Sequence, residues 1–422
     1  MIDVKHGNTP TSWLELCCTQ FIVADLVGCV VCEGSRFNRR GNIDAGSAMN
    51  TTLAFPNDCK FTFLGLTNAR VDIPATGITL PDGTEVVTKF PIDLNSQWQS
   101  WLGIQASQVC SSNLVLIRTA TNGFPPASLP ISDDTSWNLA KRIENVFSML
   151  RLLGTIEYES AFLIMGYLQN SQTVCQHFSK FGRYEITRGC LPWLIREEHL
   201  ATAASLAQTK ASLLASYPDA QSVRLFRGWW ALTSALQQFY ASDRIHGFVR
   251  ALEALIYPAI GKTEKQFIHR CSLFAAPSTG KDAARQALEE AYKMRCDVEH
   301  VHPWDRSLTQ YAVSEREDVA YWRTRQMESL ACLAYAKIFA DSVVQRHFHT
   351  DAILDQFWRK PEHEIRTALG CVCDITQLKL VKSYDSWGRA VFSEWPTGWH
   401  ETLQRRNEGH AGETFHAMGF TA

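Results

Sequence analysis

Residues 243–257 read DRIHGFVRALEALIY, and this stretch decides the kind of fold that the chain can adopt. Its apolar side chains recur every three or four positions, which is the spacing of one face of an α-helix. They are Phe248, Val249, Leu252, Leu255 and Ile256. Pro258 follows directly, and the residue before a proline is steered away from helical geometry. We therefore predict an amphipathic helix that ends at about residue 257.

Three further amphipathic patterns follow this helix along the chain. They predict helices over residues 263–274, 282–295 and 315–345, and Thr263 is the candidate cap of the first. The connections between them are short, which is typical of helices that pack as antiparallel neighbours. Residues 241–358 are therefore predicted to form a compact helical bundle.

The regions on either side of this bundle have a different pattern of apolar and turn-forming residues. Residues 1–134 carry short apolar runs separated by Gly, Pro, Asn and Asp, which predicts a β-rich N-terminal domain. Helical patterning begins after it, so we expect a helical middle region over residues 135–240 and a mixed C-terminal tail over residues 359–422. The predicted fold class is α+β, with a β-rich domain followed by a mainly α-helical region that contains the bundle.

The composition excludes several classes of protein. The 422 residues are 45% hydrophobic and carry a formal net charge of -2, so the chain is neither disordered throughout nor a uniformly basic nucleic-acid coat. An anionic partner would have to bind a local patch. Residues 1–10 do not have the pattern of a signal peptide, and the longest apolar stretch is too short to span a bilayer. We expect a cytoplasmic protein with no membrane partner.

The 13 cysteines are an odd number in a chain without a secretion signal, so reduced thiols are expected. Two local pairs, Cys29 with Cys32 and Cys371 with Cys373, could supply four zinc ligands if the two segments met. Buried free thiols are the favoured interpretation, because cysteine in an apolar run behaves as a small hydrophobic residue. We expect no metal and no cofactor.

Residues 295–304, between the third and fourth predicted helices, read RCDVEHVHPW. Cleavage of RNA by its own 2′-hydroxyl needs a base, an acid and a cation for the charge on phosphorus. Histidine can transfer protons near neutral pH, and the planar fork of arginine matches two phosphate oxygens. Arg295, His300 and His302 therefore suit metal-independent phosphoryl chemistry.

The spacing alone leaves alternatives open. Five helical residues turn through about 500°, so Arg295 and His300 meet only if the helix bends or ends between them, or if a second subunit contributes. Arg295 could instead close a helix C-terminus, where a cation favours the dipole, with the histidines in a polar loop. Arg405 and His410 show the same spacing in the tail. Trp304 could stack on a base or belong to the core.

Three segments of this region resemble the HEPN superfamily, and specifically its ApeA-like branch. They are residues 248–257, residues 264–274 with an internal Arg270, and residues 288–300, and the resemblance rests on their order and on an Arg-x4-6-His signature. His300 and His302 both satisfy that signature. The resemblance implies a four- or five-helix domain that dimerises and apposes two Arg/His motifs in one cleft.

The same resemblance implies a metal-independent endoribonuclease, often acting on tRNA, in bacterial antiphage defence by abortive infection or in toxin systems. Arg295 would be the phosphate-binding cation, His300 or His302 the proton-transfer residue, and Glu253 the acidic residue of the first helix that faces the motif. The implied partners are RNA and a second copy of the chain. The β-rich domain is expected to sense a phage-derived trigger.

Two residues depart from the pattern of the superfamily. Cys296 stands where Asn, Ser or Asp is usual, and Val301 stands where Gly is usual. An alternative function is a non-catalytic HEPN-type module that binds RNA, a nucleotide or a partner protein. A third is a structural bundle in which Arg295 only caps its helix.

Overall fold

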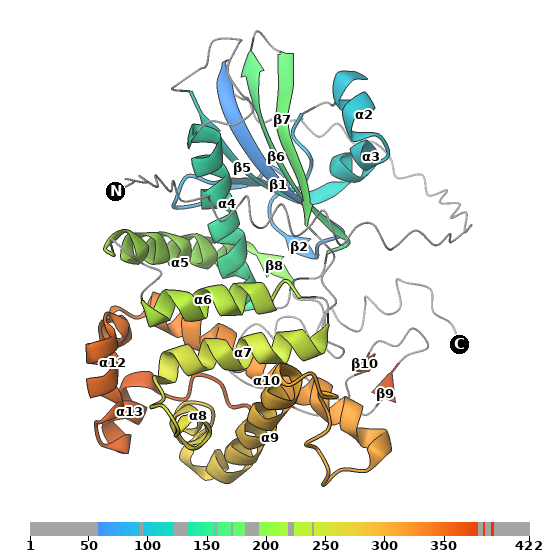
Figure 1. Cartoon of the computed structure of the whole chain (residues 1–422). Helices are drawn as coiled ribbons and strands as arrows, with labels where there is room; N and C mark the ends of the chain where they lie inside the picture. Colours follow the sequence, from blue (N-terminus) through green and yellow to red (C-terminus); the bar gives the residue numbers. More distant parts are fainter. Residues whose placement is uncertain are drawn as a thin grey trace, which may run out of the picture. The chain divides into compact units, whose positions relative to one another are not determined.

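The computed structural model describes residues 58–121, 134–181, 194–217, 223–378, 383–384 and 390–391, apart from residues 93, 95, 155, 157, 170, 171 and 239. All of them belong to one compact unit, Thr52–Ala422. An antiparallel sheet is followed by a mainly helical region, so the predicted α+β class is confirmed (Figure 1). The domain boundaries at residues 134, 240 and 358 stay a prediction. Cys29, Cys32, Arg405 and His410 lie outside the described residues.

The large sheet has six strands in the order β3-β4-β5-β1-β6-β7, and each neighbouring pair is antiparallel. Its strands are β1 (Cys59–Thr67), β3 (Ile78–Thr79), β4 (Glu85–Val87), β5 (Ser112–Ala120), β6 (Ser160–Gln169) and β7 (Gln172–Phe181). Two short pairs accompany it: β2 (Val71–Asp72) with β8 (Ile195–Arg196), and β9 (Ser383–Tyr384) with β10 (Ala390–Val391).

Helices cover both faces of this sheet, and every residue of the central strand β1 is buried. Leu64 and Leu66 share a cluster with the side chains of α4 (Asp134–Leu153), whereas Phe61 and Phe63 pack with Trp98 of α2 (Ser96–Leu102). The short α3 (Gln105–Cys110) completes the second layer (Figure 1). A strand covered on both faces has no side to expose, so even its three polar side chains, Lys60, Thr62 and Thr67, are buried.

The strands β6 and β7 lie in the region for which the sequence predicts helices, so the prediction is wrong for residues 160–169 and 172–181. The run SAFLIMGYLQ of β6 contains residues that suit either structure, and burial of both faces removes the alternation that identifies a strand. The pairing register shifts between Met165 and Gly166. A Cβ on Gly166 would overlap the backbone carbonyl of Val174, so the bulge requires glycine there.

The helical region follows the sheet along the chain. Its helices are α5 (Glu197–Ala215), α6 (Arg224–Ala235), α7 (Ala241–Ile256), α8 (Thr263–Ser272), α9 (Lys281–Glu299), α10 (Val313–Ala340), α11 (Ser342–Gln345), α12 (Asp351–Trp358) and α13 (Glu362–Leu369), with short 3-10 turns at Ser278–Gly280 and Arg346–Phe348. The four helices predicted for the bundle are confirmed as α7 to α10. The third runs four residues past its predicted end, and the fourth breaks at Asp341, whose side chain caps α11.

Helix α7 lies among α6, α8, α9 and α10, and its predicted apolar stripe is entirely buried. The crossing with α6 is close because each helix carries a glycine there. A Cβ on Gly247 would lie 2.5 Å from Cβ of Ala235, and one on Gly228 would lie 2.5 Å from Cβ of Ala254. One hydrophobic cluster extends from the sheet through α4 to these helices.

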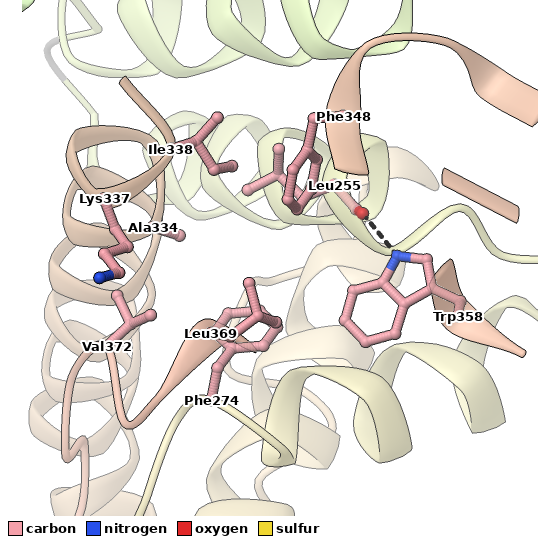
Figure 2. A pocket seen from close by; sticks show the side chains of 9 residues that line it. All are labelled: Leu255, Phe274, Ala334, Lys337, Ile338, Phe348, Trp358, Leu369 and Val372. Carbon is pink, nitrogen blue, oxygen red and sulfur yellow. Dashed lines mark hydrogen bonds between the residues drawn. The ribbon is translucent and has the colours of Figure 1, made fainter. Parts of the chain in front are cut away.

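The C-terminus of α7 is held by side chains from two other helices. The carbonyl groups of Ile256 and Tyr257 accept hydrogen bonds from Nη1 of Arg270, at 2.6 and 2.7 Å. The carbonyl of Leu255 accepts one from Nε1 of Trp358 at 2.9 Å, as Figure 2 shows. The last carbonyls of a helix have no partner inside it, so these bonds fix the end of α7 and with it the position of Glu253.

Candidate functional site

The side chain of Arg295 links α9 to α7. Its Nη1 lies 2.6 Å from Oε2 of Glu299, one turn along α9, and its Nη2 lies 3.6 Å from Oε2 of Glu253 on α7. The side chains of Arg295 and Glu253 are each 15% exposed. The guanidinium carbon also lies 5.8 Å from the ring centre of Tyr292. Among the described residues Arg295 therefore binds carboxylates of two helices rather than the terminal carbonyls that a capping role would involve.

Glu253 is surrounded by positive charge. Burial raises the pKa of its carboxyl group, and the charges of Arg295 and Arg250 oppose that rise. Arg224 of α6 contributes as well, because its Nη1 lies 3.5 Å from the carbonyl oxygen of Glu253. Guanidinium groups from three helices thus gather around one carboxylate.

A histidine that the sequence analysis did not single out lies beside Arg295. His246 precedes Glu253 by seven residues, which is almost two full turns, so both lie on one face of α7. Burial lowers the pKa of the His246 imidazole, and the nearby charges of Arg295 and Arg250 lower it further. The ring is therefore mostly neutral at pH 7. The seven-residue spacing was the only sequence signal that could have identified it.

Three polar atoms in this region are buried without a hydrogen-bond partner among the described residues. They are Nδ1 of His246, Oε1 of Glu253 and Nε of Arg295. Buried polar atoms are bonded in the great majority of cases, so several unbonded ones in one place are unusual. We call His246, Arg250, Glu253, Arg295 and Glu299 the α7–α9 cluster. Its polar groups are not fully used in holding the fold together.

His300 and His302 lie in the turn that ends α9. His300 is the C-cap, and Val301 adopts a positive φ of 59°. The N–H of Val301 donates to the carbonyl of Val298 at 3.0 Å and that of His302 to the carbonyl of Asp297 at 2.8 Å, which is a Schellman motif. Both imidazoles are exposed, with ring centres 6.4 Å apart. The turn requires a residue with left-handed backbone geometry at this position. Glycine is usual there, and this chain has Val301 instead.

The structure brings together some of the predicted site residues and not others. Arg295 and Glu253 are in contact, whereas no interaction between described residues joins Arg295 to His300 or His302. The neighbouring Trp304 packs edge-on against Tyr321 at 5.0 Å between ring centres and joins the core, rather than presenting a free face.

A second ion pair on α9 behaves differently. Nε of Arg323 on α10 lies 2.6 Å from Oε2 of Glu290, and both side chains are buried. The other oxygen of Glu290 accepts from Gln310, Tyr311 and Gln286. Because this network is bonded throughout, we assign it to holding the loop after α9 against α9 and α10.

Two other regions can be set aside as sites. An apolar pocket near the end of α7 has about 10 Å³ of free space, which is room for a single water molecule at most (Figure 2). It is lined by Leu255, Phe274, Ala334, Lys337, Ile338, Phe348, Trp358, Leu369 and Val372. In the described part of the chain, no three His, Cys, Asp or Glu side chains are arranged to hold a metal ion.

Cys373 is buried and Cys371 is exposed, and the proposed zinc partners of this pair lie outside the described residues. None of the described helices combines the length and the apolar character needed to cross a membrane.

Comparison with known proteins identifies no relative: no family model, no curated protein and no solved structure matches this chain.

Proposed function

We propose that this chain is a metal-independent endoribonuclease whose helical bundle resembles the HEPN superfamily. The observation that carries the proposal is the α7–α9 cluster, in which the largely buried guanidinium of Arg295 lies beside a carboxylate and an imidazole and is incompletely bonded. The chemistry follows from these groups. An arginine fork binds two non-bridging phosphate oxygens and stabilises the negative charge that develops on them.

The reaction needs two proton transfers. A base takes the proton of the 2′-hydroxyl, and the 2′-oxygen then attacks the adjacent phosphorus. The bond from phosphorus to the 5′-oxygen breaks, and that oxygen takes a proton from an acid. The products are a 2′,3′-cyclic phosphate and a 5′-hydroxyl. His300 and His302 are exposed and are therefore accessible to a bound RNA.

Substrate binding requires an exchange of partners at Arg295. The Glu299 side chain is 44% exposed and occupies Nη1, so it can turn into solvent while a phosphate takes its place. Because one partner of this ion pair lies partly in solvent, the pair is weaker than a fully buried one, and a phosphate can compete with it. Glu253 is largely buried and would keep the arginine oriented during the exchange.

The partners and setting are part of the proposal. The substrate is RNA, with tRNA as the first candidate, and the chain acts in the bacterial cytoplasm in antiphage defence. A homodimer through the helical bundle would bring the histidines of one copy to Arg295 of the other, which is needed if His300 or His302 acts there. The N-terminal region would respond to a phage-derived trigger.

One observation favours the non-catalytic alternative. Both Glu253 and Glu299 contact Arg295, so its charge is balanced within the chain. A module that only binds RNA, a nucleotide or a protein could keep such an arrangement permanently.

Incubation of the purified full chain with total tRNA in EDTA tests the proposal. We expect fragments that end in 2′,3′-cyclic phosphate, and a loss of at least about 100-fold in rate for Arg295→Ala. His300→Ala and His302→Ala identify which exposed imidazole contributes. Arg285→Ala is the matched control, because Arg285 is an exposed residue of the same helix and should leave the rate unchanged.

RNA binding without cleavage would support the non-catalytic module instead. Because the enzyme could require its trigger, growth arrest on expression is measured with the same variants. The proposal fails if the wild-type chain neither cleaves tRNA nor arrests growth in an Arg295-dependent way.

A further inference from the structure

We propose that His246 is the base that takes the 2′-hydroxyl proton, so that the base and the phosphate-binding cation belong to the same chain. This inference rests on the proposed ribonuclease function and assigns a further catalytic residue to it. It moves the base from the exposed turn after α9 to the contact between α7 and α9.

The position of His246 is the first argument. His246 and Glu253 share one face of α7, and Arg295 of α9 lies against both. His246 is only partly buried, and its ring is hydrogen-bonded to the backbone of Arg295, which holds the ring next to the residue whose guanidinium would bind the phosphate. Neither His300 nor His302 contacts Arg295 in the described part of the chain.

The charges around His246 are the second argument. A general base has to be neutral before it can accept a proton. The charged groups that face the ring are Arg250 from its own helix, and Arg295 and Glu299 from α9. Burial and the two arginines keep the pKa of His246 below its ordinary value, and they are opposed only in part by Glu299 and by the hydrogen bond between the ring and the backbone of Arg295. The imidazole is thus ready to accept a proton at neutral pH.

The bound phosphate would then change this balance in the direction that catalysis needs. Its negative charge would offset the charge of Arg295 and favour the imidazolium that forms as the proton arrives. The ring is hydrogen-bonded to the backbone of Arg295, and its buried Nδ1 has no partner among the described residues, so one ring nitrogen is left to accept a proton. The same phosphate would thereby bind to Arg295 and assist the transfer to His246.

The proposed step forms one bond to phosphorus and breaks another. The 2′-hydroxyl proton passes to the imidazole of His246, the new bond forms between the 2′-oxygen and phosphorus, and the bond from phosphorus to the 5′-oxygen breaks. The 5′-oxygen takes its proton from His300, His302 or water. His246 releases its proton to solvent after the product leaves.

The test compares wild type with His246→Gln and His246→Asn in the full chain. Gln and Asn place an amide near different ring nitrogens, and the variant whose urea unfolding matches wild type is used. His363→Ala, an exposed histidine of α13, is the control. We expect kcat for tRNA to fall at least about 100-fold, whereas the affinity for an all-2′-deoxy oligonucleotide, which cannot be cleaved by this route, stays within about threefold.

The pH profile separates a base from a structural residue. In wild type, kcat/KM should rise with pH through an acid limb that lies below the ordinary pKa range of histidine, and this limb should be absent from the His246 variant. A histidine resonance titration adds a readout without catalysis. Inorganic phosphate should raise the pKa of His246 in wild type and not in Arg295→Ala.

The inference is overturned if wild type cleaves tRNA and the His246 variant cleaves it equally fast, or if the acid limb is the same in both. In those cases the ribonuclease function stands and only the assignment of the base is wrong. If wild type fails every cleavage and growth test, the ribonuclease function itself is wrong, and the assignment of His246 as its base is wrong as well.

Discussion

Replacement of Val301 by glycine should stabilise the protein although it removes a side chain. Val301 has a φ of 59°, and its side chain is 92% exposed. A β-branched residue is strained in this conformation because its Cβ approaches the backbone. The substitution therefore removes strain and loses almost no packing. The two hydrogen bonds of the turn come from backbone groups and remain in place.

The magnitude follows from two opposing terms. A non-glycine residue in the left-handed region costs about 1–2 kcal/mol, and Val301→Gly removes that cost. Glycine loses more conformational freedom on folding, which costs about 0.5–1 kcal/mol. The free energy of unfolding should therefore rise by about 0.5–1 kcal/mol. Val301→Asn should give a smaller rise, because asparagine tolerates this conformation but keeps its Cβ.

Urea unfolding followed by circular dichroism measures the change, with the midpoint shifted and the slope unchanged. Val313→Gly is the matched control, because Val313 is also exposed, at 78%, but stands in the first turn of α10. Glycine should lower the stability there by a few tenths of a kcal/mol. An equal loss of stability in both variants would refute the argument from the turn.

Three further predictions concern the stability of the fold. Arg323→Met should lower the free energy of unfolding by about 3–5 kcal/mol in urea titration, because it leaves the buried carboxylate of Glu290 unpaired. Gly228→Ala should lower the free energy of unfolding by about 1–3 kcal/mol, because the new Cβ overlaps the hydroxyl of Tyr335. In a double-mutant cycle, adding Tyr335→Phe to the same chain should recover part of that loss. Burial raises the pKa of Glu144 from 4.5 to about 7, so the contribution of this group to stability falls as the pH rises from about 4.5 to about 7. Glu144→Gln should therefore gain about 2 kcal/mol relative to wild type between pH 5 and pH 8 in thermal or urea unfolding.

The predictability of the fold differs between its two parts. The helices α7, α8 and α9 could be predicted because each buries one apolar stripe, and a stripe leaves a helical period in the sequence. Helix α10 is instead buried on all sides over residues 330–336, and its length and the absence of Gly and Pro identify it. The strand β6 could not be predicted, because a strand buried on both faces leaves no alternation and residues 162–165 suit helix and strand equally. Long-range pairing with β1 decides between them, and pairing is a tertiary effect that no local window contains. The half-buried edge strand β7 was missed together with β6.

The sequence identifies some of the residues of the site, but it does not show how they are arranged in space. Arg295 and Glu253 were both identifiable, yet their contact depends on how α9 packs against α7. His246 lies on a polar side of α7 and becomes a candidate only when Arg295 is known to face that side. The turn at Val301 could not be predicted for a different reason. Valine rarely adopts a positive φ, so the sequence gives no sign of a Schellman motif there.

Two arginine–glutamate pairs that involve α9 differ in how completely they are bonded. Glu290 and Arg323 are buried and bonded on every side, so neither can change partners without exposing the other's charge in the core. Arg295 instead shares its donors between the exposed Glu299 and a looser contact to Glu253, and its Nε is unbonded. A complete pair resists exchange and therefore holds structure. An incomplete pair can accept a phosphate at low cost, which is why we assign the chemistry to Arg295 rather than to the more deeply buried Arg323.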